Sequence, residues 1–385
     1  MAARAEKHPT LLALTSSAML LPAYQDVQAD APPEFTELGL RYSKYEEDDT
    51  SGRKTDGGSS QRYEVTMAQF HLMAPVADDW SLALDVQWED MSGASPWFVG
   101  ESDAGDPKVF MSGASIEDTR TDVSVITRYY YDRGSAGFNY IRSEEDDYES
   151  NAIAVDASFN SADGMTTYSA ALSASDDDIE PTQGITPTNT LKDEKDIRST
   201  WVGVSRIVSK RAILRIGLGY TYRDGFLTDP YKLNDRRPDE RKEWTANAGY
   251  RHFFLAPNAA LHTDYRYFDD NWGVASHTID MAWHQNVGND TQVIPFLRYY
   301  TQDEADFFAN LVDLQDRYYA DDYRLSAFGA ITIGLRLRHD IGNWSVNLTG
   351  ERYRTDESWG VFSGDESPAL VDYWRYSIGL DYVFK

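Results

Sequence analysis

Runs of about ten to thirteen residues in which apolar and polar side chains alternate recur from about residue 34 to the C-terminus. The side chains of a β-strand point alternately to its two faces, so each run predicts a strand with one apolar and one polar face. In residues 211–223, for example, Leu214 and Ile216 share one face, whereas Arg215 and Gly217 share the other. The alternation predicts an all-β protein in which every strand presents one face to an apolar medium.

The connections between these runs are alternately short and long. We expect about sixteen strands, beginning near residues 35, 61, 80, 118, 136, 148, 165, 197, 211, 241, 259, 273, 291, 323, 344 and 371. Short turns fall at 76–79, 132–135, 160–164, 208–211, 255–258, 287–290 and 340–343, and longer polar loops at 47–60, 91–117, 177–196, 223–240, 303–322 and 355–370, with shorter ones near 144–150 and 269–273. This pattern is typical of a closed antiparallel up-and-down transmembrane β-barrel, with tight turns at one end and long loops at the other.

The modest share of apolar residues is consistent with lipid as the apolar medium. Only 41% of the residues are hydrophobic and the formal net charge is −27, but a barrel strand exposes only alternate residues to lipid and its loops expose none. Closing the ring also satisfies the backbone hydrogen bonds without water. The alternative is a soluble β-sandwich or propeller, which would have to bury all of these apolar faces in a limited core. No blade-length repeat is visible.

The first residues are typical of an export signal. Arg4 and Lys7 precede a short apolar run at 11–23, and small residues suited to cleavage follow. We therefore expect a signal peptide at residues 1–29 and the barrel at residues 30–385. The alternative is a disordered or amphipathic N-terminus. No later run is long and apolar enough to predict a transmembrane helix.

Composition excludes several classes of chemistry. The chain has no cysteine, which rules out disulfides, thiolate metal sites and a cysteine nucleophile. Its 63 acidic against 36 basic residues argue against nucleic acid as a partner. Acidic runs at 46–49, 144–147 and 176–178 lack the spacing of a calcium loop, so we interpret them as solvated, with weak divalent bridging to lipopolysaccharide as the alternative.

No motif predicts catalysis. The chain contains neither the G-x-S-x-G motif of a serine nucleophile nor the H-E-x-x-H motif of a zinc site, and its seven histidines are scattered. We therefore expect a protein that is not an enzyme and that has no cofactor and no resident metal.

Charged side chains within the alternating runs indicate which face points away from lipid, because each would cost about 2–4 kcal/mol at the membrane midplane. The lumen candidates are Arg215, Arg251, Arg298, Arg336, Arg338, Arg375, Asp85, Asp280 and Asp381. Either they line a water-filled pore and select solutes by charge, or they pair across the lumen and fill it. A sixteen-stranded barrel is normally wide enough for a channel, which favours the pore.

The long loop at 91–117 is the best candidate for a constriction. It carries the apolar side chains Trp97, Phe98 and Phe110, which are unusual in an outside loop and favour burial in the barrel mouth. The alternative is a surface flap or a contact between subunits.

The last strand resembles the C-terminal recognition strand of bacterial outer-membrane barrels. That pattern combines a polar residue, a glycine and two aromatics, here Ser377, Gly379, Tyr382 and Phe384, although the chain continues to Lys385 where the pattern usually stops. The resemblance implies that Gly379, Tyr382 and Phe384 form a signal that is read by the barrel-insertion machinery.

A narrower resemblance covers most of the chain. The segments SGASP (92–96), SGASIEDTR (112–120) and DRRPDERKEW (235–244) resemble those of an uncharacterised family of Gram-negative outer-membrane proteins, a domain of unknown function. The resemblance implies a location and a barrel fold but no activity.

Together these patterns predict a porin-like outer-membrane channel, or solute-binding pore, for small polar or charged solutes. The alternative is a scaffold, assembly or export barrel whose closed, salt-bridged lumen holds a surface or periplasmic protein partner. In both cases we expect contact with outer-membrane lipid and lipopolysaccharide and with the insertion machinery. The pattern specifies no oligomeric state.

Overall fold

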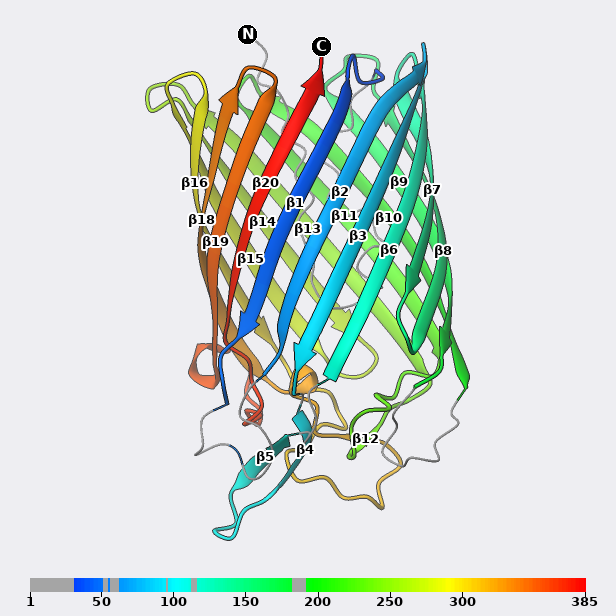
Figure 1. Ribbon diagram of the computed structural model, residues 1–385, viewed down its shortest axis with the longest axis vertical. Coiled ribbons are helices and arrows are strands. Elements are labelled where there is room, and N and C mark those ends of the chain that lie inside the picture. Colours follow the sequence, from blue (N-terminus) through cyan, green and yellow to red (C-terminus); the bar gives the residue numbers. More distant parts are fainter. Residues whose placement is uncertain (1–30, 51–54, 56–61, 95, 112–115, 182–191) are drawn as a thin grey trace.

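Sixteen antiparallel strands close into one barrel in the computed structural model, which describes residues 31–50, 55, 62–94, 96–111, 116–181 and 192–385 (Figure 1). In order, the barrel strands are β1 (Thr36–Glu47), β2 (Glu64–Ala77), β3 (Trp80–Gly93), β6 (Ile116–Tyr131), β7 (Gly134–Glu144), β8 (Tyr148–Asn160), β9 (Thr166–Ile179), β10 (Asp193–Ser209), β11 (Ala212–Gly225), β13 (Glu240–Phe254), β14 (Ala259–Asp270), β15 (Ala275–Val287), β16 (Thr291–Gln302), β18 (Phe328–Ile341), β19 (Trp344–Asp356) and β20 (Tyr373–Phe384). The predicted fold class is therefore confirmed. The expected signal segment at 1–29 lies outside the described residues.

The barrel closes where its first and last strands meet. β1 and β20 pair antiparallel over their whole lengths, from Thr36 opposite Phe384 to Glu47 opposite Tyr373. This pairing continues the ladders that link every other neighbouring pair of strands, so no strand edge is left open. The C-terminal strand thus completes the ring, as its alternating pattern predicts.

The two ends of the barrel differ. The chain's C-terminus lies at the end with the tight turns, which we call the turn end, and the long connections gather at the other, the loop end (Figure 1). The turns use backbone conformations that suit glycine: Gly288 and Gly342 have φ values of 68° and 63°. All seven turns lie where the sequence predicts them.

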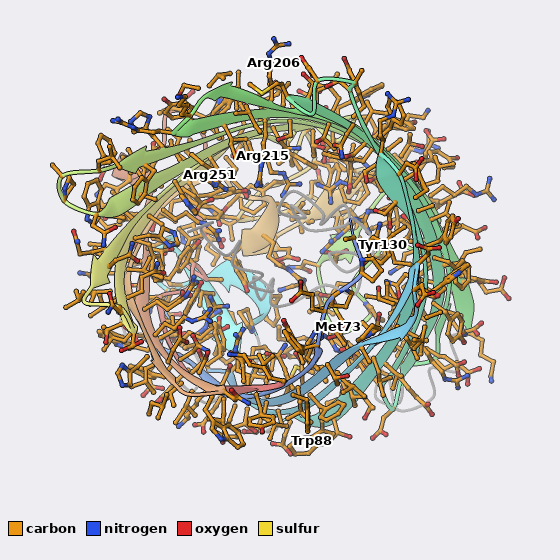
Figure 2. The ribbon with its side chains drawn as sticks, turned by 90° about the horizontal axis from the view of Figure 1, so that it is seen from above. Met73, Trp88, Tyr130, Arg206, Arg215 and Arg251 are labelled. Carbon is orange, nitrogen blue, oxygen red and sulfur yellow. The ribbon has the colours of Figure 1, made fainter. Side chains whose placement is uncertain are left out.

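The two faces of the wall differ as the alternation predicts. Figure 2 looks along the barrel axis: Trp88 and Arg206 point outward, whereas Met73 and Tyr130 point into the ring. Apolar side chains of the outer set are exposed, for example Ile216 at 55%. Exposure of this kind would be costly in water, so the barrel requires a hydrocarbon surround.

Glycines in the wall let one lumen aromatic lie flat. A Cβ at Gly203 would come within 2.2 Å of the Trp201 ring, and one at Gly217 within 2.8 Å. Gly203 and Gly217 face each other on β10 and β11, so the indole covers backbone that only glycine leaves bare.

The loop end carries structure that the sequence pattern did not predict. Two small sheets form there, β4 (Pro96–Glu101) with β5 (Pro107–Met111) and β12 (Asp235–Arg236) with β17 (Tyr319–Ala320), together with the 3-10 turns η2 (Tyr323–Leu325) and η3 (Glu357–Trp359). Apolar side chains from several loops form a separate cluster at this end: Trp272, Val274, Ala305, Phe308, Ala320 and Leu325. The loops that the sequence indicates as polar connections therefore fold into a packed layer. No helix in the described ranges has the length and apolar character needed to cross a membrane.

Candidate functional site

The charges of the lumen form ion pairs along the wall. Asp280 of β15 accepts a 2.6 Å hydrogen bond from Arg298, its direct partner on β16. Arg375 and Glu351 are direct partners on β20 and β19 and lie 2.9 Å apart. Each of these pairs links neighbouring strands, so it stabilises the wall without crossing the lumen.

The other predicted lumen positions also lie on the inner face of their strands. Arg251 contacts Asp264 at 2.8 Å, Asp85 contacts His71 at 2.5 Å, and Arg338 contacts Asp340 at 3.1 Å. Asp381 accepts a 2.7 Å hydrogen bond from Asn347, Arg336 lies 5.9 Å from the ring of Phe296, and Arg215 points into the ring in Figure 2. The part that these residues play in conduction stays a prediction.

Exposure of the lumen pairs changes along the barrel. The side chains of Arg298 and Asp280, near the middle of their strands, are 42% and 37% exposed although they face inward. At the loop end, Glu47 and Arg62 form an ion pair whose side chains are only 2% exposed each. The lumen is therefore accessible at mid-height and is covered at the loop end.

The centre of this cover is the buried carboxylate of Asp322. Its oxygens accept hydrogen bonds from Arg324 at 2.8 Å and from Arg237 at 2.7 Å, and Lys232 lies 4.0 Å away. Burial alone would raise the pKa of Asp322, but Arg324, Lys232 and Arg237 outweigh it and hold this pKa well below its usual range. Asp322 thus joins the loop after β16 to the loop after β11.

Asp321, the preceding residue, ties in the β4–β5 hairpin. It accepts hydrogen bonds from the backbone N–H of Val99 at 2.8 Å and from Asn234 at 3.0 Å. Burial raises the pKa of Asp321 to about 6. Three long loops therefore meet at two consecutive aspartates, and in Figure 2 segments of the loop end cross the ring.

Two further loops join the cover through Arg62. Besides its ion pair with Glu47, Arg62 donates a 3.0 Å hydrogen bond to the carbonyl of Ala369, and its guanidinium lies 5.6 Å from the Tyr323 ring. Burial raises the pKa of Tyr323 above its ordinary value, so its hydroxyl stays neutral and its ring lies beside the Arg62 cation.

The predicted constriction residues lie in the β4–β5 hairpin, which stands beyond the barrel rim in Figure 1 rather than inside the lumen. Phe98 stacks on Phe110 at 4.6 Å, and Trp97 contacts Phe98 edge-on at 5.2 Å. The hairpin packs these rings against one another, and Trp97 stays 36% exposed. Narrowing of the lumen by these rings stays a prediction.

The predicted insertion signal spans both faces of β20. Tyr382 and Phe384 lie on the outer face, with ring centroids 4.7 Å apart, and Tyr382 also packs against Trp344 at 4.5 Å. Gly379 faces the lumen beside Arg41 and Asn347. Recognition of these residues by the insertion machinery stays a prediction.

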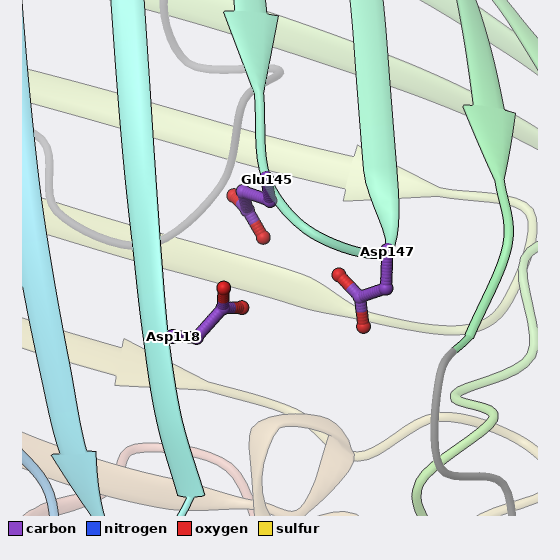
Figure 3. Close-up of side chains that lie close together, drawn as sticks. All are labelled: Asp118, Glu145 and Asp147. Carbon is purple, nitrogen blue, oxygen red and sulfur yellow. The ribbon is translucent and has the colours of Figure 1, made fainter.

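Three carboxylates meet at the loop end of β6 and β7. Asp118, Glu145 and Asp147 each place an oxygen within 4.8 Å of the others (Figure 3). Burial raises the pKa of Glu145 to about 7 and that of Asp147 to about 6, and repulsion from Asp118 adds to both shifts. A hard divalent cation prefers such oxygens, so these residues could hold one.

The sequence missed this cluster because the run at 144–147 has no metal-ligand spacing. Our interpretation of that run as solvated is wrong for Glu145 and Asp147, which are partly buried. The sequence did contain one signal. The alternation of β6 places Asp118 on the lumen face, so a third carboxylate lies beside the short loop between β7 and β8.

Replacing Glu145 with glutamine is expected to stabilise the barrel at pH 8 but not at pH 5. The folded pKa of about 7 lies above the ordinary glutamate value of 4.5. The folded protein therefore binds more protons than the unfolded one between these values, and stability falls as pH rises through this window. Thermal unfolding in detergent at both pH values measures the effect. An equal shift at both would contradict the assigned pKa, and Asp103→Asn, on an exposed loop, is the control.

Comparison with known proteins places the chain in a family. The model of a family described as "Protein of unknown function (DUF3570)" matches residues 11–366. The chain belongs to the DUF3570 family. No curated protein matches this DUF3570 chain.

Solved structures similar to the DUF3570 chain are outer-membrane barrels. CdiB from Acinetobacter baumannii is 12% identical with a TM-score of 0.54, over 91% of this chain and 60% of that one. A bacterial polysaccharide outer membrane secretin is 9% identical with a TM-score of 0.49, over 91% and 99%, and the siderophore receptor PirA from Pseudomonas aeruginosa is 11% identical with a TM-score of 0.46, over 90% and 62%. The DUF3570 chain spans about 60% of CdiB and PirA. At these identities only the shared barrel fold follows.

Proposed function

We propose that this chain is an outer-membrane channel that passes small polar or charged solutes through its lumen, with a loop-end cover that limits access from outside. The observation that carries the proposal is the exposure of the Arg298–Asp280 pair at mid-lumen. Ion pairs that run along the wall leave the axis of a sixteen-stranded ring to water. We place the turn end at the periplasm, since tight turns lie there in outer-membrane barrels.

The proposal includes export through a signal peptide at residues 1–29, a barrel at 30–385, and no catalytic activity. Lipid and lipopolysaccharide would surround the exposed outer face, and the insertion machinery would read β20. Passive diffusion is the mechanism, with the charged wall setting which solutes enter.

A second candidate is a scaffold or export barrel that holds a protein partner. The closed loop-end layer favours it, because the buried contacts of Asp322, Asp321 and Arg62 join loops in a way that a simple open pore does not need. The fold shared with CdiB is consistent with this candidate but assigns no partner.

Planar-bilayer recording distinguishes the two candidates. For a channel, we expect purified protein to give steady conductance steps, and joint Arg336→Ala and Arg338→Ala changes to shift ion selectivity because both side chains face the lumen. No conductance from wild-type protein or from variants with a loosened cover would favour the scaffold. The characteristic faster migration of an unheated barrel on gels verifies that each sample is folded.

A further inference from the structure

A group of basic side chains converges on one part of the lumen wall, on β11, β13, β14 and β15. Arg215 and Arg251 both point into the ring and lie close together in Figure 2. Arg251 is the direct cross-strand partner of His262, and the rings of His262 and His284 are 4.0 Å apart. Four nitrogen-rich side chains from four adjacent strands therefore share one area of the wall.

Gly249 makes this convergence possible. It is the cross-strand partner of Arg215 on one side and of Asp264 on the other. A Cβ at Gly249 would lie 2.7 Å from Asp264 Oδ1, 3.7 Å from Arg215 Cβ and 3.9 Å from Arg251 Nη1. The bare backbone thus forms a floor over which three charged side chains meet.

One carboxylate belongs to this group. Asp264 contacts Arg251 Nη2 at 2.8 Å, and Arg251 Nη1 also donates to the carbonyl of Thr263 at 3.2 Å. These contacts hold one edge of the Arg251 guanidinium against the wall and fix its position. Asp280, the direct partner of Asp264 on β15, is itself paired with Arg298. The guanidinium groups of Arg215 and Arg251 against Asp264 therefore leave an excess of positive charge, and the two imidazoles add N–H donors.

We propose that this area, which we call the Arg215–Arg251 site, is a binding site for the oxyanion group of a solute, a carboxylate or a phosphate. The proposal rests on the channel function and names its substrate class as anionic. A guanidinium matches the planar or tetrahedral oxygens of such groups with paired N–H donors. The anion lies beside the guanidinium groups of Arg215 and Arg251, which donate to it, and the histidines supply further N–H groups.

The competing explanation is that these arginines only brace the wall through Asp264. The two explanations predict different effects of Asp264→Asn on anion binding. If the site binds anions, loss of the nearby negative charge strengthens binding. If the arginines only brace the wall, the same change weakens the barrel and leaves anion binding unchanged.

The experiment measures reversal potentials across planar bilayers in a KCl gradient near 0.1 M salt, where charge effects are weakly screened. We expect wild-type protein to prefer chloride over potassium by about threefold, and the double variant Arg215→Gln with Arg251→Gln to lose that preference. Arg206→Gln is the matched control, because Arg206 points outward in Figure 2. The double lysine variant keeps the charge and is expected to keep the preference.

A second measurement does not depend on conduction. Calorimetric titration of inorganic phosphate into folded barrel in detergent is expected to show binding that weakens about tenfold in the double glutamine variant and strengthens in Asp264→Asn. Phosphate binding without conductance would support the site and overturn the channel. Conductance with unchanged selectivity and phosphate binding in the double glutamine variant would overturn the site and leave the channel intact.

Discussion

Replacing Asp322 with alanine is expected to open the loop end of the barrel. The change leaves Arg237 and Lys232 buried without their shared carboxylate. Breaking a buried ion pair from one side costs about 3–5 kcal/mol, and the half-exposed Arg324 places this case toward the lower end. Asp322 is the carboxylate that joins the loop after β16 to the loop after β11, so its loss separates these loops and single-channel conductance rises severalfold.

Two readouts check this opening. Single-channel conductance measures how open the pore is, and limited trypsin digestion measures how accessible the loop is to cleavage. Arg317, where trypsin can cut, lies five residues before Asp322 on the exposed part of the same loop. Asp316→Asn removes a carboxylate from that loop at an exposed position and is expected to change neither readout. Unchanged conductance together with faster cleavage in Asp322→Ala would show that the cover does not limit the channel.

The second large effect is expected from Leu335→Arg, which should strongly impair folding into lipid. Leu335 lies near the middle of β18 on the outer face and is 44% exposed. An arginine on the lipid face near the midplane costs about 2–4 kcal/mol, and the hydrocarbon offers it no partner.

Urea titration of the barrel in lipid vesicles measures that free energy. Thr349→Arg is the matched control. Thr349 lies on the lumen face of β19, the strand next to β18, directly opposite Arg336 and at a height similar to that of Leu335. The control variant is expected to fold with near-normal stability because water can solvate its new charge. Equal destabilisation by both substitutions would argue that the outer face does not contact hydrocarbon.

The cover also has a pH dependence with a definite sign. Burial raises the pKa of Asp321 to about 6, above the ordinary aspartate value of 3.8. The folded cover therefore takes up a proton between these values, and its stability falls as pH rises through them. Asp322 acts in the opposite sense, because its lowered pKa makes its ion pairs fail only in strong acid. Closure is thus expected to be firmest in mildly acidic solution.

The sequence alone was enough to predict the barrel and, in the strands that alternate clearly, the side of the wall on which the charges lie; in the runs at 61–73, 197–208 and 291–302 either face could point outward. A strand has a period of two, so the alternation around Leu214 and Arg215 assigns both residues to their faces without knowledge of any neighbour. The short turns fix the strand order, because two strands joined by two to five residues pair with each other. For the same reason, the antiparallel register of the turn end follows from the sequence.

Only the tertiary structure decided how the charges pair and what covers the lumen. Arg62 and Ala369, which share a hydrogen bond in the cover, are 307 residues apart, and no local pattern links them. Gly249 brings Arg215 and Asp264 together only through the register of three strands. The sequence therefore determined the local geometry of each strand, while ring closure decided which loops meet, since contacts between distant segments depend on the whole arrangement of strands.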